Sequence, residues 1–249
     1  MTNNIYLIAN WKMYGSIKSV NSINKVIQLS KKPLLKNINI VYCPPFTLSH
    51  IFAKKLKNSK INVGAQDCYI HHDTGPFTGN ISAKQLKNIG LKYVILGHSE
   101  KRNDGDTNKI INKKIFAAIK NKLKVILCIG EKYEENIKKL TIKTLKKQIN
   151  DCLKNIPKKN VIFIAYEPVW SIGTGLIPKN EDLEKIIKKI RTIVLKEKKF
   201  INSKFLYGGS VNEKNIKNLT KIKGLNGFLI GGASQNSNKF IDIVKKTII

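Results

Sequence analysis

Short apolar runs alternate with amphipathic stretches along the whole chain. The runs are nearly continuous in Val, Ile and Leu, which is typical of parallel strands that are covered on both faces. Between them, apolar residues recur at positions i, i+3 and i+4, which predicts amphipathic helices. The predicted strands are 6–10, 38–42, 61–65, 93–96, 125–129, 161–165, 204–207 and 227–230, and the clearest helices are 17–29, 110–119, 136–153 and 182–195.

Strand and helix follow one another eight times, with no composition break or linker between the repeats. This regular alternation predicts an α/β fold, and it favours one closed (β/α)8 barrel with eight parallel strands over an open, doubly wound sheet. The chain has 249 residues, 42% of them hydrophobic, which is enough to bury a core without disulfides. We therefore expect a single barrel domain over residues 1–249.

The chain is strongly basic, with 46 Lys and Arg against 16 Asp and Glu and a formal net charge of +30. Only Arg102 and Arg191 are arginine, the side chain best suited to bidentate phosphate and base contacts. The lysines are spread over nearly every helical stretch, and no aromatic-interleaved patch accompanies them. We expect weak, salt-sensitive attraction to polyanions but no specific nucleic-acid partner.

The four cysteines, Cys43, Cys68, Cys128 and Cys152, have no metal-ligand spacing, so we interpret them as reduced thiols of a cytoplasmic protein. The apolar stretch that follows the first residues is too short for a signal peptide, and it lacks the basic residues that would precede one. No apolar run reaches membrane-spanning length. Neither a metal-ligand set nor a dinucleotide fingerprint is visible, and Gly173-Thr174-Gly175 lacks a third glycine. The sequence predicts no metal, no cofactor and no membrane partner.

Glu167 stands where the sixth predicted strand ends, and Pro168 and a glycine-spaced loop follow it. A carboxylate on a rigid strand end, next to a loop able to hinge, suits proton abstraction under a closing lid. A lone glutamate here would more often cap the next helix. The catalytic interpretation depends on the polar residues that follow the other strands, because the carboxyl ends of barrel strands carry the chemistry.

Other polar side chains follow the first and fourth predicted strands. Asn10 and Lys12 leave the first strand on one face, where the ammonium group could stabilise an anionic substrate or a developing oxyanion. His98 follows the fourth strand ahead of Ser99 and Glu100, and could donate to a substrate carbonyl. A lone histidine is more often structural, and a lone lysine would be ordinary on this surface.

Glycine pairs follow the last two predicted strands, in Gly208-Gly209-Ser210 and in Gly231-Gly232, and each is expected to open onto a helix. Such turns can direct several backbone N–H groups at one phosphate, although a single pair is more often only a tight turn. A base, a carbonyl-polarising donor, an ammonium group and a phosphate cradle together indicate proton transfer next to the carbonyl of a small phosphorylated compound.

The chain resembles the triosephosphate isomerase family from residue 5 to its C-terminus. The matching motifs are Ala9-Asn10-Trp11-Lys12, Gly64-Ala65-Gln66, Phe77-Thr78-Gly79, Gly97-His98-Ser99-Glu100, Tyr166-Glu167-Pro168-Val169-Trp170, Ile172-Gly173-Thr174-Gly175, Tyr207-Gly208-Gly209-Ser210 and Gly231-Gly232-Ala233-Ser234. The resemblance implies the glycolytic and gluconeogenic interconversion of D-glyceraldehyde 3-phosphate and dihydroxyacetone phosphate through an enediolate, without a cofactor. The family is itself a well-known example of a glutamate base, a neutral histidine and a closing loop.

The resemblance also implies a role for each matching residue. Glu167 would move the proton, His98 would polarise the carbonyl, and Lys12 would stabilise charge. Asn10 and Glu100 would orient these groups, and the lid, residues 168–178, would close over the intermediate. Ile172 and Leu229 would cover Glu167 and raise its basicity. Backbone N–H groups of four residues would hold the phosphate: Gly173, Ser210, Gly231 and Gly232.

The family is usually a homodimer, so the resemblance implies a partner contact through the loop around Phe77-Thr78-Gly79, with Thr78 reaching the partner's active site. The family commonly has a Glu and an Arg that pair across this contact, where the present chain has Asn80 and Lys101. Losing both members of an exposed pair costs little. We expect a dimer whose association is weakened.

The second hinge of the lid differs from the family pattern. A family tyrosine matching Tyr207 hydrogen-bonds to the backbone N–H at the position of Pro178, and proline has no N–H. One neutral hydrogen bond contributes about 1 kcal/mol. We expect a lid that closes less firmly on an active enzyme.

Two alternatives remain open from the residues. One is another sugar-phosphate isomerase or an aldolase on the same barrel, although an aldolase would place a Schiff-base lysine in the sixth strand, which Glu167 closes instead. The other is a binding or scaffolding role for the basic surface. Mutation of Glu167 separates catalysis from a binding role: isomerase activity should be lost while polyanion binding stays unchanged.

Overall fold

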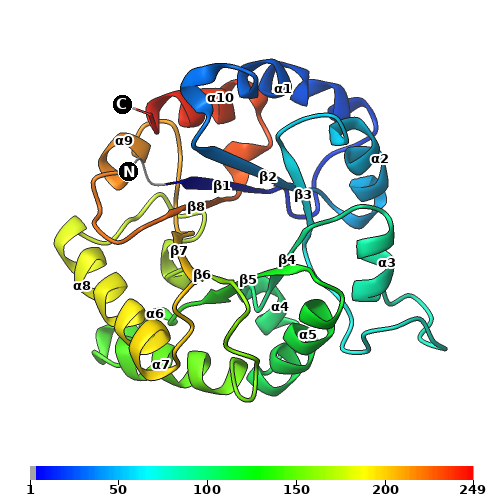
Figure 1. Ribbon diagram of the computed structural model, residues 1–249. Helices are drawn as coiled ribbons and strands as arrows, with labels where there is room; N and C mark the ends of the chain where they lie inside the picture. The colour runs from blue at the N-terminus through cyan, green and yellow to red at the C-terminus, as the bar shows by residue number, and fades with distance from the viewer. Residues whose placement is uncertain (1–3, 249) are drawn as a thin grey trace.

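The computed structural model describes residues 4–248, which form a closed barrel of eight parallel strands in sequence order, surrounded by a ring of helices (Figure 1). This confirms the predicted (β/α)8 fold. The ring closes where β1 pairs with β8, with Tyr6 beside Gly227. The strands are β1 (Ile5–Asn10), β2 (Ile38–Cys43), β3 (Asn62–Ala65), β4 (Tyr93–Leu96), β5 (Lys124–Ile129), β6 (Ile162–Tyr166), β7 (Lys204–Tyr207) and β8 (Gly227–Ile230).

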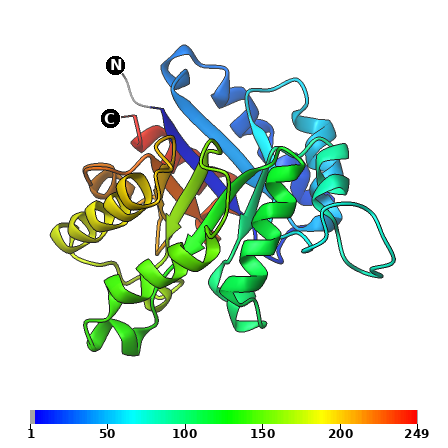
Figure 2. The ribbon, with the colours of Figure 1, turned by 60° about the horizontal axis from the view of Figure 1, so that its bottom comes forward.

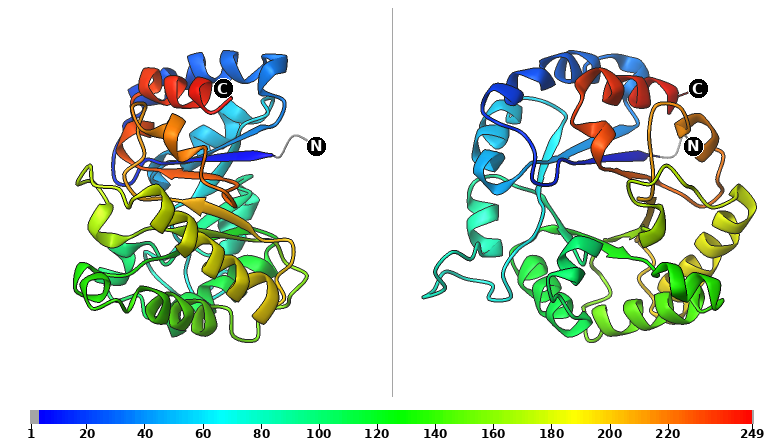
Figure 3. Two further views of the ribbon diagram at one scale, coloured as in Figure 1. Left: turned by 90° about the vertical axis from the view of Figure 1, so that its left-hand side faces the viewer. Right: turned by 180° about the vertical axis from the view of Figure 1, so that it is seen from behind.

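The helices lie outside the strands, as the side views show (Figure 3). None of those in the described part of the chain is long and apolar enough to cross a membrane. Their bounds are α1 (Asn24–Ser30), α2 (Phe46–Leu56), α3 (Ala83–Asn88), α4 (Ser99–Asn103), α5 (Asn108–Lys120), α6 (Tyr133–Ile137), α7 (Thr141–Cys152), α8 (Asn180–Arg191), α9 (Ile216–Leu219) and α10 (Ser237–Lys246).

Three of the four predicted helices are divided in the structure. The stretch 17–29 begins as a 3-10 helix, Lys18–Ile23, in which the Ser22 hydroxyl donates to the carbonyl of Ser19 and competes with the α-helical pattern. The stretch 136–153 is interrupted at Lys139, whose φ of 56° ends α6. The stretch 182–195 passes from α8 into a π-helical turn, Thr192–Glu197. The apolar spacing continues across these breaks, whereas the α-helix itself is interrupted by local backbone and side-chain geometry.

The strands are buried on both faces, so two apolar layers result. The outer layer lies between the barrel and its helices. The inner layer fills the barrel with side chains from alternate strand positions, including Ile8, Cys128, Ala165, Leu206 and Leu229. Because the interior is packed up to the carboxyl ends of the strands, an open site can form only above this layer.

Candidate active site

Asn10 and Glu167 continue the inward-facing rows of their strands. Ile8 on β1 and Ala165 on β6 belong to the inner apolar layer. Because side chains alternate along a strand, the residues two positions further on face the same way. Asn10 and Glu167 therefore point over the carboxyl end of the barrel, where their side chains are 5% and 3% exposed.

A cavity of about 410 Å³ lies at this end of the barrel. It brings together residues from the ends of five strands, β1, β4, β6, β7 and β8, that are far apart in the sequence. Of the predicted site residues, only Glu100 does not line it; its carboxylate reaches the site through Lys12 instead. The predicted residues around the cavity are Asn10, Lys12, His98, Glu167, Gly173, Ser210, Gly231 and Gly232.

Glu167 is held by its backbone, whereas its carboxylate is almost unpartnered. Its N–H donates to the carbonyl of Ile129 (2.8 Å). Gly208 leaves room for the carboxylate, because a Cβ there would lie 2.9 Å from Glu167 Oε1. Within the described residues, Oε2 is buried without a hydrogen-bond partner. Burial raises the pKa of Glu167, against the opposing effects of His98, Cys128 and Lys12, so this carboxylate is a stronger base than an exposed one.

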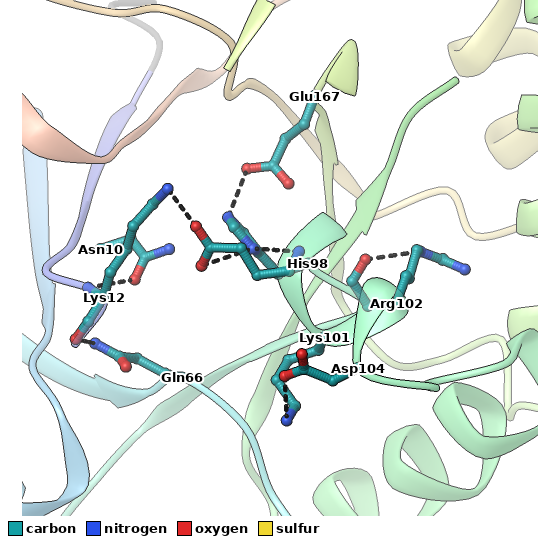
Figure 4. A network of polar contacts seen from close by, with 10 residues as sticks. Asn10, Lys12, Gln66, His98, Lys101, Arg102, Asp104 and Glu167 are labelled. Carbon is teal, nitrogen blue, oxygen red and sulfur yellow. Dashed lines mark hydrogen bonds and ion pairs between the residues drawn. The ribbon is translucent and has the colours of Figure 1, made fainter. Parts of the chain in front are cut away.

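The hydrogen-bond geometry of His98 assigns its tautomer. The residue is the N-cap of α4, and its Nδ1 accepts from the backbone N–H of Glu100 (3.3 Å). An Nδ1 that accepts carries no hydrogen, so this contact assigns the ring hydrogen to Nε2; Nδ1 also lies 3.5 Å from Glu100 Oε2. Nε2 faces the cavity, 3.7 Å from Glu167 Oε1 (Figure 4). The donor of the histidine and the carboxylate of the glutamate thus meet at one point.

Lys12 has a left-handed backbone, with φ of 54°. Its N–H donates to Asn10 Oδ1 (3.1 Å), and its ammonium group pairs with Glu100 Oε1 (2.6 Å) (Figure 4). Gln66 Nε2 donates to the carbonyl of Lys12 (2.8 Å) and to that of Cys43 (2.9 Å). Three polar residues, from the end of β1, the first turn of α4 and the loop after β3, therefore fix the position of this lysine.

Sequence reasoning did not assign a role to Gln66, although it lies in one of the matching motifs directly after the third strand. It also missed Arg102, which braces the turn carrying His98. Arg102 Nε donates to the carbonyl of Gly97 (2.8 Å) and Nη2 to that of Cys128 (3.3 Å). In a chain with only two arginines, the position of one of them directly after the His98 motif was a usable signal.

The two glycine pairs lie side by side along the cavity wall, but the expected helices do not both follow them directly. Gly231-Gly232 leads into a 3-10 turn, Gly232–Ser234, whose last carbonyl accepts from Trp11 Nε1 (3.0 Å). After Gly208-Gly209-Ser210, a loop comes first and α9 begins only at Ile216. The sequence predicted that each pair opens onto a helix; behind Gly208-Gly209 the helix follows only after a turn in which Asn212 and Asn215 each accept from the other's backbone N–H, the reciprocal pattern of a capping box. The backbone N–H groups of these turns are the candidate donors to an anion at this wall of the cavity.

The segment after Glu167 lies over one side of the cavity. Its tip, residues 173–177, is exposed, whereas its start is anchored to the buried carboxylate of Glu131. Glu131 Oε1 accepts from Trp170 Nε1 (3.0 Å) and from the Tyr166 hydroxyl (3.2 Å). Burial raises the pKa of Glu131, opposed by these donors. Sequence reasoning gave Glu131 no role, although it follows the fifth predicted strand by two residues.

Within residues 4–248, no three His, Cys, Asp or Glu side chains are close enough together to bind a metal ion. The cavity instead holds a desolvated carboxylate, a neutral imidazole donor, an ammonium group and two glycine turns. These groups can remove a proton next to a carbonyl and hold a phosphate. Fold and site define the class: a (β/α)8 enzyme for proton transfer in a small phosphorylated compound.

Comparison with known proteins identifies the family to which this enzyme belongs. The family model described as triosephosphate isomerase matches residues 5–247. A protein named triosephosphate isomerase from Dictyoglomus thermophilum is 42% identical over 246 residues, covering 96% of this chain and 98% of that protein. Proteins of the same name from Aquifex aeolicus (38% identity; 96% and 97% covered) and Buchnera aphidicola subsp. Cinara cedri (41%; 98% of each) agree. The chain belongs to the triosephosphate isomerase family.

This membership confirms the resemblance and the enzyme class predicted from the sequence. It does not favour another sugar-phosphate isomerase or an aldolase on the same barrel.

Proposed function

We propose that Glu167, His98 and Lys12 carry out the family's reaction, the glycolytic interconversion of D-glyceraldehyde 3-phosphate and dihydroxyacetone phosphate. One observation carries the proposal: His98 Nε2 lies 3.7 Å from Glu167 Oε1 inside a cavity that Lys12 also lines. A carbonyl beside His98 and the adjacent C–H beside Glu167 can occupy this space at the same time. Proximity of base and donor lowers the barrier only when both act on one bound molecule.

The reaction follows from these positions. Glu167 takes a proton from the carbon next to the carbonyl, and the electron pair moves onto the carbonyl oxygen to form an enediolate. The hydrogen on His98 Nε2 and the charge of Lys12 stabilise this oxyanion. The oxyanion takes the proton of the neighbouring hydroxyl group, a transfer that His98 Nε2 can relay, and Glu167 returns its proton to the former carbonyl carbon, so that the carbonyl moves by one position. Asn10 and Glu100 act on Lys12, since they contact its backbone and its ammonium group.

Backbone N–H groups of Gly173, Ser210, Gly231 and Gly232 hold the phosphate in this proposal. All four residues line the cavity. The lid, residues 168–178, closes over the enediolate and keeps water away from it. Ile172 and Leu229 line the same cavity and supply apolar cover for Glu167.

Replacing the histidine tests the assignment of the carbonyl donor. We expect His98→Asn to lower kcat by about 10²–10³-fold, the usual loss when one donor to a developing oxyanion is removed. The measurement is a coupled assay with D-glyceraldehyde 3-phosphate. His50→Asn makes the same chemical change at an exposed position on α2 and should keep full activity. Equal activity of the two variants would show that His98 does not polarise the carbonyl.

We propose that the chain functions as a homodimer. The loop between β3 and α3 projects from the barrel (Figure 2), and Thr78 and Gly79 at its tip are exposed. Apolar side chains near the site are exposed too, with Met13 94% and Ile17 71% exposed. Exposed apolar groups of this kind mark contact surfaces. Lys101 pairs with Asp104 of its own chain (3.2 Å), and the predicted weakening of the dimer stays a prediction.

A charge placed on the projecting loop should separate the two copies. We expect Thr78→Arg to raise the dimer dissociation constant by about 100-fold or more, because it places further positive charge in an interface of an already basic chain. Sedimentation velocity over a range of protein concentrations measures this. Leu34→Arg places the same arginine at another exposed residue (73%) and serves as the control. A wild type that sediments as a monomer at micromolar concentration would rule out the proposed dimer.

We also propose that residues 1–249 act as one domain in the cytoplasm. The family match over residues 5–247 and the one closed barrel support the first point. The second is supported by the four cysteines, which are all buried and unpaired.

A further inference from the structure

The hydroxyl of Ser171 makes three polar contacts that the family's reaction does not explain. Ser171 is fully buried at the end of the 3-10 turn Val169–Ser171, where the lid begins. Its Oγ donates to the carbonyl of Leu176, on the far side of the lid. The same Oγ lies 3.3 Å from the Tyr207 hydroxyl and accepts from the backbone N–H of Ser210 (3.3 Å).

These three contacts use the whole capacity of a serine hydroxyl, which has one hydrogen and two lone pairs. Because the hydrogen goes to Leu176, the Tyr207 hydroxyl and the Ser210 N–H both act as donors. Gly209 permits the arrangement, since a Cβ there would lie 2.2 Å from the Tyr207 oxygen and 2.8 Å from Ser171 Oγ. The contact is therefore a built feature of this loop.

Ser171 consequently joins the lid to the loop of the proposed phosphate site. Its bond to Leu176 ties the two sides of the lid together, and its bond from Ser210 ties the lid to the phosphate loop. Pro178 has no N–H, so it cannot draw the Tyr207 hydroxyl away from Ser171. The Ser171 hydroxyl is therefore one of the restraints that hold the lid in the observed position.

We infer that Ser171 is a positioning residue that couples phosphate binding to movement of the lid. The inference rests on the proposed function, in which the Ser210 N–H binds the phosphate. This N–H points at Ser171 Oγ in the observed structure, so phosphate and Ser171 compete for it. A phosphate oxygen is charged and is the stronger acceptor. When phosphate takes the N–H, Ser171 loses one of its three partners and the observed lid position loses a restraint.

The competition has a consequence for affinity. A ligand shifts a conformational equilibrium only by its different affinity for the two states. Part of the phosphate's binding energy is spent on displacing Ser171 from the Ser210 N–H. Removing the Ser171 hydroxyl should therefore strengthen phosphate binding, whereas removing an ordinary contact of a binding loop would weaken it.

Inorganic phosphate is the probe, and Ser171→Ala is the variant. We expect the phosphate dissociation constant to fall about fivefold, the effect of one neutral hydrogen bond. The phosphate group is bound more tightly by the same amount in the ground state and in the transition state, so KM should fall with little change in kcat. Fluorotryptophan labelling reports the lid, because the chain has two tryptophans and one of them, Trp170, lies next to Ser171. Without phosphate, the Trp170 signal of Ser171→Ala should move toward its position in phosphate-bound wild type.

Ser49→Ala is the matched control, since it removes a buried serine hydroxyl on α2 that donates to the carbonyl of Pro45, outside the lid and the cavity, and leaves Ser210 bonded to Ser171. Its phosphate dissociation constant should equal that of wild type. The wild type also gives a test that needs no variant: the amide proton signal of Ser210 should shift when phosphate is added.

Unchanged or weaker phosphate binding in a folded Ser171→Ala variant would overturn the coupling. So would a Ser210 amide proton whose chemical shift stays the same when phosphate is added. Neither result would affect the assignment of the base. That assignment fails separately, if Glu167→Gln keeps full isomerase activity.

Discussion

Glu167→Gln is expected to lower kcat by between about 10² and 10⁴-fold, the range that a positioned general base contributes. The amide has nearly the shape of the carboxylate but cannot take a proton. The unpartnered Oε2 of Glu167 is the atom whose basicity is lost. The coupled assay with D-glyceraldehyde 3-phosphate measures the effect.

Glu134→Gln is the control, because it removes an exposed carboxylate on α6 that does not line the cavity. Full activity is expected. A Glu167→Gln enzyme within tenfold of wild type would assign the base to another residue.

The same variant should be more stable than wild type at pH 8. Burial raises the pKa of Glu167 in the folded chain, so the folded chain binds this proton more tightly than the unfolded chain does. Stability of the wild type therefore falls as pH rises from the ordinary glutamate pKa through the raised one. Glutamine has no such cost. The stability gain of Glu167→Gln should shrink as pH falls through the raised pKa toward the ordinary one and stay constant below that, and urea titrations at several pH values measure it.

Lys114→Met should lower the free energy of unfolding by about 3–5 kcal/mol at neutral pH, the usual cost of breaking a buried ion pair. Lys114 on α5 is buried, with its Nζ 2.8 Å from Asp67 Oδ2 and 2.8 Å from Asp106 Oδ2. Without the ammonium group, two carboxylates face each other with no counter-charge. Urea denaturation at a fixed protein concentration is the measurement, because the proposed dimer would make stability depend on concentration.

The pH dependence of this loss separates charge from packing. Burial already raises the pKa of Asp67, and the Asp106 carboxylate adds to this, whereas Lys114 opposes it. Losing Lys114 raises the folded-state pKa further above the unfolded value, so the variant should regain stability as pH falls through the raised pKa. Lys113→Met, at an exposed position of the same helix, should stay within about 0.5 kcal/mol of wild type. A loss equal at pH 5 and pH 8 would indicate packing instead.

Much of the fold could be predicted because strand order here follows chain order. Each apolar run and each helix that follows it is a local pattern, and right-handed repetition of one unit leads to a barrel. The breaks at Lys139 and after Arg191 were missed, since the apolar period continues across them. Helix ends depend on single backbone dihedrals, and a hydrophobic pattern does not encode those.

The candidate site was predictable to the extent that strand ends carry chemistry. Glu167, His98 and Lys12 are polar residues that follow apolar runs closely. Because the strands are parallel, the residues that follow them gather at one end of the barrel. Lys114 could not be found this way, because one buried lysine looks like any other in a chain so rich in lysine. Ser171 was equally hidden: its three partners lie 5, 36 and 39 residues away.

The amino-acid sequence by itself determined the barrel, the family and the residue types around the cavity, because these depend on hydrophobic period and on short motifs. Only the tertiary structure decided the hydrogen on His98 Nε2, the free oxygen of Glu167 and the three-way contact of Ser171. Each of these depends on distances between groups from different strands. Burial and hydrogen-bond geometry arise when the strands close, and no local pattern carries them.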